Sequence, residues 1–304
     1  MTENISLGLL LGAILLIIAF PIFKLTKSKT FIILLGILFL TFSFVFSTKN
    51  VSTQYFVVSF FTVAFVKLLD LHLSFKIWQQ FTLKHWLTYL NQPFSLGIQA
   101  AKNAVYSTKA ASLKLIIRGL STMVSGSLIF MLSLQWHVAN ISVWLQHSFN
   151  FVAFMLFCYD GLWVFLMGFY RFCGGKTILL CNNPLLSATP AEFWRNYNRM
   201  SSDYFNQYFY KSLKRNKQLE WAVFVPFTIS GLVHEYMLFA SSLQLSGLST
   251  LYFLISGVAT FLTLRLKLNG YKRIIGIILT LVYQYFSLYF LLKAYDFVFP
   301  EIYP

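Results

Sequence analysis

The chain has 304 residues, of which 58% are hydrophobic, 19% aromatic and only 11% charged. Soluble globular domains carry about 25% charged residues, so the composition excludes an ordinary soluble domain and predicts a polytopic membrane protein. A net charge of +15 would suit nucleic-acid binding, but the positions of the cations assign this charge to membrane topology instead.

Eight stretches approach or reach the length of about 20 mostly apolar residues that a membrane crossing needs. These predicted spans cover residues 5–23, 30–47, 52–69, 115–135, 149–170, 219–240, 246–264 and 274–293. The sequence shows no internal repeat, and no polar segment between the spans is as long as a soluble domain. The sequence therefore predicts a single membrane-embedded domain over residues 1–304, all-α, with about eight transmembrane helices plus interfacial amphipathic helices.

The cations fall on one set of connections. If the first span runs from outside to inside, 22 of the 24 Lys and Arg residues are cytoplasmic, and only Lys49 and Lys293 lie on the other side. This positive-inside pattern predicts both termini outside and two long cytoplasmic connections, about 70–114 and 171–218. The first span has no cationic residues before it, so we expect it to be uncleaved. A composition rich in Phe, Ile, Lys and Asn is typical of a bacterial source, hence an inner-membrane location.

The first cytoplasmic connection mixes aromatic residues, such as Trp78 and Trp86, with Lys76 and Lys84. This composition predicts a helix that lies in the lipid headgroup region. Asp160 falls within the fifth span, where a charged side chain requires a partner on another helix or a functional role. We include it among candidate cavity residues.

The second cytoplasmic connection contains a helix start. Thr189, Pro190 and Glu192 form a capping-box pattern, which predicts a helix from Pro190. The helical spacing would place four residues on one side, and the two arginines Arg195 and Arg199 elsewhere: the four are Phe193, Trp194, Tyr197 and Asn198.

A second short helix is expected after a cap at Ser201 or Ser202. It would carry an apolar stripe along the membrane surface and end in a cationic cluster. That cluster, which includes Lys211 and Lys214, would meet anionic lipid or an anionic cofactor.

His234 is the strongest candidate for chemistry. It lies fifteen residues after Leu219, about 22 Å along the predicted helix, and small neighbours such as Ser230 leave room beside it. A neutral imidazole is the side chain best suited to take a proton from an alcohol at neutral pH. The alternative is a His that only hydrogen-bonds another helix.

Glu235 points about 100° away from His234 on a regular helix, so we expect it to form a structural ion pair. The other four His residues and the three Cys residues have no metal-ligand spacing, and we expect no metal site.

Two motifs, FWRNYN at 193–198 and SGLVHEY at 230–236, together resemble the membrane-bound O-acyltransferase family. Their order, their spacing of about 36 residues and the intervening aromatic-basic segment carry the resemblance. It covers about residues 184–240, and the preceding NNPLLSATPAEFW is similar to the wax synthase-like branch.

The resemblance implies that His234 is the catalytic residue and that Asn198 is the second active-site position. Asn, rather than His, at 198 is typical of the sterol, diacylglycerol and wax acyltransferases, which implies a lipid or long-chain alcohol acceptor. Tyr197 stands where the family usually has Trp.

The expected reaction is acyl transfer from a thioester to a hydroxyl. His234 would be the general base and Asn198 a donor to the carbonyl oxygen. The donor would be acyl-CoA, a co-substrate rather than a bound cofactor, with its phosphates on cytoplasmic cations: Arg195, Arg199, Lys211 and Lys214. Trp194, Tyr197, Ser230 and Asp160 would line the cavity. A polysaccharide O-acetyltransferase and a non-enzymatic lipid transporter or binding protein are the alternatives.

Overall fold

The computed structural model describes residues 2–46, 50–92, 95–97, 107–137, 142–178, 180–215 and 218–300. Within these ranges the regular structure is helical and no strand is formed, which confirms the all-α prediction. Helices occupy every predicted span: α1 (Thr2–Thr26), α2 (Lys29–Val45), α3 (Val51–Leu73), α7 (Lys109–His137), the continuous α8, η1 and α9 (Val143–Phe154, Met155–Leu162, Trp163–Phe172), α13 (Leu219–Ser242), α14 (Leu248–Thr263) and α15 (Tyr271–Tyr295).

Among the described residues, six of these helices are long and apolar enough to cross a membrane. The other two, α2 and α14, are apolar but shorter, with 17 and 16 residues. The structure therefore supports a multi-pass membrane protein.

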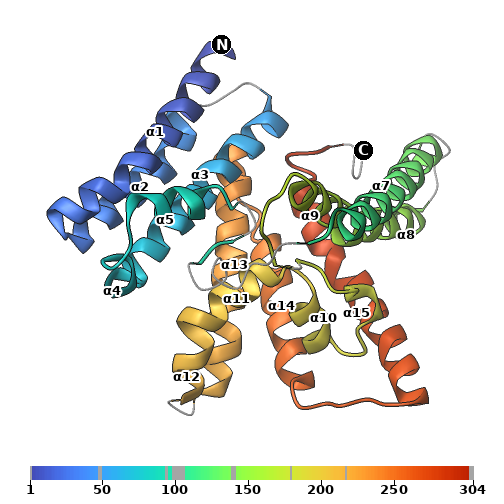
Figure 1. Ribbon diagram of the computed structural model, residues 1–304. Helices are drawn as coiled ribbons and strands as arrows, with labels where there is room; N and C mark the ends of the chain where they lie inside the picture. Colours follow the sequence, from blue (N-terminus) through green and yellow to red (C-terminus); the bar gives the residue numbers. More distant parts are fainter. Residues whose placement is uncertain are drawn as a thin grey trace.

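The N-terminal helices form a bundle at one side of the molecule (Figure 1). Its core is strongly aromatic, and Phe20, Phe39 and Phe61 are at most 1% exposed. Side-chain caps begin α2 and α3: Ser28 accepts from the Phe31 N–H, and Asn50 accepts from the Thr53 N–H. Each cap satisfies a backbone donor that a helix start leaves free.

The predicted headgroup helix is instead part of this bundle. Two short helices, α4 (Phe75–Trp78) and α5 (Leu83–Leu90), follow α3. Trp78 and Trp86 are fully buried against the Phe20 ring, and the Trp86 indole N–H donates to the Leu16 carbonyl at 2.8 Å. These indoles face protein because the bundle offers both an apolar surface and a hydrogen-bond acceptor.

Helix α7 packs closely against the α8–η1–α9 span. The contact is made through glycines on both sides, including Gly119 and Gly126 on α7, and Gly161 and Gly168 on its neighbour. A Cβ at Gly119 would lie 2.6 Å from the Phe165 Cα. Small residues allow this approach, as in many membrane helix pairs.

Helices α13 and α14 lie between the N-terminal bundle and the α7–α9 helices, and α15 packs beside α14 (Figure 1). Tyr236 on α13 donates to the Leu40 carbonyl of α2 at 2.7 Å, and Tyr55 on α3 bonds to Tyr295 on α15 at 2.8 Å. His147 on α8 bonds to the Tyr285 carbonyl of α15 at 2.8 Å. Helices α13 and α15 therefore connect the N-terminal bundle to the α7–α9 helices, and the cavity described below lies among these central helices.

Replacing Gly119 by Ala should destabilise the protein. The new methyl group would meet the Phe165 backbone, and overpacking of this kind costs about 1–3 kcal/mol, more than the gain in helix propensity. The measurement is the apparent Tm in detergent. Ser121→Ala, at an exposed position of the same helix, is the control, and an equal or higher Tm for Gly119→Ala would contradict the close packing.

Candidate functional site

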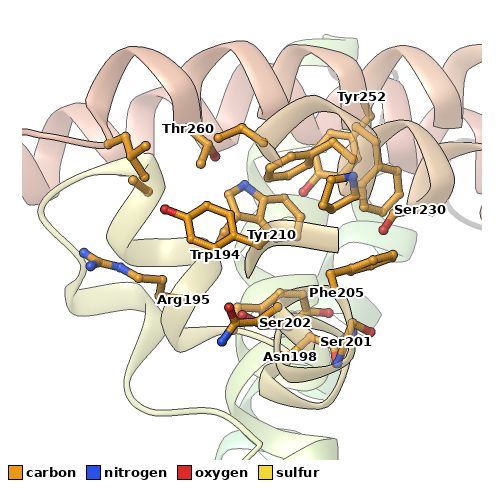
Figure 2. A pocket seen from close by; sticks show the side chains of 18 of the residues that line it. Trp194, Arg195, Asn198, Ser201, Ser202, Phe205, Tyr210, Ser230, Tyr252 and Thr260 are labelled. Atoms are coloured by element: carbon orange, nitrogen blue, oxygen red, sulfur yellow. The ribbon is translucent and has the colours of Figure 1, made fainter. Parts of the chain in front are cut away.

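A cavity of about 690 Å³ lies among the central helices and the segment that follows α9. One wall is the membrane helix α13. The facing wall is a set of short helices, α10 (Pro190–Asn196), α11 (Arg199–Phe205) and the π-helical η3 (Asn206–Tyr210), and α14 closes a third side. Figure 2 shows the side chains of these elements turned toward a shared space.

One stripe of α13 lines the cavity along most of the helix. The residues recur at helical spacing: Leu219, Ala222, Val223, Pro226, Phe227, Ser230 and His234. From Leu219 to His234 the stripe covers about 22 Å at 1.5 Å per residue. The cavity therefore extends from the first turn of α13 to the imidazole deep within the span.

The orientation of the His234 ring is set within its own helix. Its Nδ1 lies 2.8 Å from the Ser230 carbonyl oxygen, one turn earlier. Because a carbonyl only accepts, Nδ1 carries the proton and Nε2 keeps its lone pair. The Phe253 ring of α14 packs against the imidazole with centroids 4.7 Å apart. This arrangement provides a proton acceptor in a largely apolar chamber.

Asn198 lines the same cavity from the opposite wall. The prediction that Asn198 continues α10 on the side of Phe193 and Trp194 is wrong, because α10 ends at Asn196 and Tyr197 is extended. Asn198 itself has a left-handed backbone, with φ of 45°, and its Oδ1 accepts from the Ser201 N–H at 3.3 Å. It therefore caps α11 in place of the expected Ser201 or Ser202. Asn adopts this conformation more readily than most residues, and its amide N–H₂ is available to donate to a ligand.

Helix α10 begins at Pro190, as predicted, but Glu192 accepts from the residue before the cap instead of from the Thr189 N–H of a capping box. Thr189 accepts from the Glu192 N–H at 3.1 Å, and Glu192 reaches back to the Ala188 N–H at 2.8 Å. Glu192 also forms an ion pair with Arg273 at 2.8 Å, on the first turn of α15. Partial burial raises the pKa of Glu192, but the Arg273 and Ala188 hydrogen bonds outweigh it and bring the pKa below its ordinary value. Glu192 is thus an anion that ties α10 to α15.

Of the four predicted phosphate-binding cations, only Arg195 lines the cavity. Arg199 and the exposed Lys211 lie outside its lining, and the Lys214 side chain is outside the described residues. Arg265, which sequence reasoning did not assign to the site, lines the cavity just beyond α14. The only sequence signal for Arg265 was its membership of the cytoplasmic cation group.

Three predicted cavity residues, Trp194, Tyr197 and Ser230, line the cavity. Asp160 does not line it: it forms an ion pair with Arg118 of α7, which also donates to the Asn183 side chain at 2.7 Å. For a carboxylate inside a span, the sequence left open either a functional role or a partner on another helix, and the structure shows a partner on another helix.

Glu235 forms hydrogen bonds instead of the expected ion pair. Its Oε1 accepts from the Ser246 and Gly247 N–H groups, at 2.9 and 2.6 Å, and from the Ser246 hydroxyl. These donors belong to the turn before α14, whose free N–H groups attract an anion.

Three tyrosines that line the cavity were not predicted from the sequence. Tyr159 and Tyr252 line it, and their hydroxyls lie 3.2 Å apart. Tyr295 lines it as well, beside Phe154 and Leu291. No sequence motif marks these residues, because they come from three different spans.

No protein-family model matches the chain, and a search of curated proteins finds no match. In the part of the chain that the structure describes, no group of three or more His, Cys, Asp or Glu residues could hold a metal ion.

Substitution of Asn198 should separate its backbone role from its side-chain role. Asn198→Ala should lower stability by about 1–2 kcal/mol, since it removes the cap and places Ala at positive φ. Asn198→Gly should cost only a few tenths of a kcal/mol, because Gly is tolerated both as a cap and at positive φ. The apparent Tm of the two variants in detergent checks this order. Equal losses would contradict the left-handed assignment.

Proposed function

We propose that the protein is an intramembrane O-acyltransferase. It moves an acyl group from a thioester donor, acyl-CoA, to the hydroxyl of a lipid or long-chain alcohol. The observation that carries the proposal is the His234 ring, held through Nδ1 by the Ser230 carbonyl, in one cavity with the Asn198 amide. In the neutral ring this contact leaves Nε2 as the basic nitrogen. The resemblance of the two motifs to the membrane-bound O-acyltransferases supports the same reading.

The reaction begins with the acceptor hydroxyl at His234. Nε2 takes the hydroxyl proton as the oxygen attacks the thioester carbonyl carbon, which forms the new C–O bond. The carbonyl oxygen becomes negatively charged and receives a hydrogen bond from the Asn198 amide, a contribution worth about 2.7–4 kcal/mol in comparable sites. The C–S bond then breaks, and the leaving thiolate takes the proton back from His234.

The Ser230 carbonyl has a second function in this cycle. When Nε2 is protonated, the imidazolium carries a full charge in a low-dielectric chamber, which is unfavourable without a partner. The bond from Nδ1–H to the carbonyl oxygen strengthens as the ring becomes charged. Ser230 therefore orients the base and stabilises its charged form.

The polarity of the cavity suits a donor that is anionic at one end and apolar at the other. Arg195 and Arg265 lie at the end where α13 begins and α14 ends, and can bind phosphate. Phe154, Leu291 and Phe253 line the apolar part, where an acyl chain and a lipid acceptor would be kept from water.

The topology agrees with a cytoplasmic donor. Helix α12 (Lys211–Arg215) and the α14–α15 connection lie at one end of the molecule, while α1 begins and α15 ends at the other (Figure 1). With the cation-rich end inside, and with α2 and α14 also crossing, the chain has eight crossings and both termini outside. For a bacterial protein this membrane is the inner membrane.

Transfer should depend on His234 far more than on other His residues. Protein in nanodiscs is incubated with radiolabelled acyl-CoA of several chain lengths and a lipid extract, and labelled lipid ester is measured. We expect His234→Ala to lower the rate by about 10²–10⁴-fold and Asn198→Gly by about 10²–10³-fold. His85→Gln is the control, at an exposed position outside the cavity lining where Gln can still accept from the Thr82 N–H.

Wild-type protein that is folded but transfers no acyl group to lipid would contradict the proposal. Transfer of labelled acetyl groups to a cell-envelope polysaccharide would then identify a different acceptor class. An unchanged rate for His234→Ala would contradict the role of His234 even if transfer occurs.

A further inference from the structure

Two buried hydrogen-bond donors that line the cavity have no partner among the residues that the structure describes. They are the Trp194 Nε1 and the Thr260 hydroxyl, and Thr260 is only 7% exposed. A helical Thr ordinarily satisfies its hydroxyl at the carbonyl one turn back, as Thr263 does with Ala259 at 2.7 Å. Thr260 does not do so. Buried donors are normally paired, so this pair indicates a ligand with acceptor atoms.

The two donors lie between the charged and the catalytic ends of the cavity. In the view of Figure 2, Trp194 and Thr260 lie between Arg195 on one side and Ser230 and Tyr252 on the other. The Trp194 ring packs on Phe253, with centroids 5.9 Å apart. Phe253 packs on His234, and Thr260 follows Phe253 by seven residues, about 10 Å along α14. Arg265 comes five residues later. A ligand that reaches from Arg265 to His234 must pass both donors.

A pantetheine arm has acceptor atoms at the matching distance. It carries two amide carbonyls between the thioester sulfur and the phosphate, and the second carbonyl carbon is eight bonds from the sulfur. An extended chain covers about 3.3–3.6 Å per three bonds, so this carbonyl lies about 9–10 Å from the sulfur. With the thioester at His234, the second amide falls at the level of Thr260 and the phosphate continues toward Arg195 and Arg265.

We propose that Trp194 Nε1–H and Thr260 Oγ–H donate hydrogen bonds to the amide carbonyls of a pantetheine arm. The inference rests on the proposed function and makes these two residues determinants of donor specificity. A thioester without the amides would leave both buried donors unpaired, and polar pockets reject such analogues strongly. The pantetheine arm is shared by coenzyme A and carrier proteins, so the selection applies to either source.

Binding of non-transferable thioethers tests the proposal without catalysis. The two probes are S-hexadecyl-pantetheine and an analogue with both amides replaced by ethylene units, in competition assays on nanodiscs. Wild type should prefer the amide-containing probe, and Thr260→Val and Trp194→Phe should each reduce that preference about five-fold, the loss expected for one hydrogen bond. The ratio for the two probes on one sample cancels the fraction of folded protein, and comparing that ratio between each variant and wild type cancels the difference in lipid partitioning between the probes.

Two matched variants serve as controls. Thr228→Val removes a hydroxyl that is already bonded to the Phe224 carbonyl, and Trp221→Phe changes an indole that is 61% exposed. Both should keep the wild-type preference. A preference that survives in Thr260→Val and Trp194→Phe would overturn this inference alone. Failure of wild type to bind the pantetheine probe would overturn the proposed donor as well.

The source of the arm is resolved by two further probes, S-hexadecyl-CoA and the S-hexadecyl form of an acyl carrier protein. Tighter binding of the CoA probe than of S-hexadecyl-pantetheine, lost in Arg195→Ala and Arg265→Ala, would identify coenzyme A. Tighter binding of the carrier-protein probe would identify a carrier protein. Both results support the pantetheine subsite, provided that Thr260→Val weakens the binding of the tighter probe.

Discussion

The hydrogen bond between His234 Nδ1 and the Ser230 carbonyl is the contact on which the site depends. A polar ring inside a membrane span must satisfy its donor without water. Here the acceptor lies one turn back on the same helix, so no second helix is needed to fix the ring. The tautomer, and with it the basic Nε2, follows from local geometry. What the rest of the fold must supply is a chamber on that side of α13.

That chamber is formed by joining two unlike walls. Helix α13 is a membrane helix, whereas α10, α11 and η3 belong to the connection between α9 and α13. Short helices of this kind are marginal without tertiary contacts. Their anchors are polar. Glu192 pairs with Arg273, and Tyr208 of η3 donates to the buried Asp70 at the end of α3. Burial, together with the Asp70 charge, raises the pKa of Tyr208, so it remains a neutral donor.

Features that depend on local pattern were predictable from the sequence. Apolar length located the spans, the Thr189 cap located the start of α10, and a lone imidazole in a span drew attention to His234, which lines the cavity. Features that depend on distant partners were not. Arg118, the partner of Asp160, is 42 residues away, and the acceptor for Trp86 is the Leu16 carbonyl, 70 residues away. Arg265 enters the cavity only because α14 packs against α10 and α13, a contact with no local signal.

The adjacent residues His234 and Glu235 contribute to the site in two different ways. A rotation of about 100° between neighbours places Glu235 away from the cavity and against the turn before α14, where it accepts from Ser246 and Gly247. That contact fixes where α14 begins. Phe253 lies six residues after Gly247, and its ring packs on the His234 imidazole. The two residues are therefore not a catalytic dyad: His234 faces the cavity directly, while Glu235 acts on it through the position of α14.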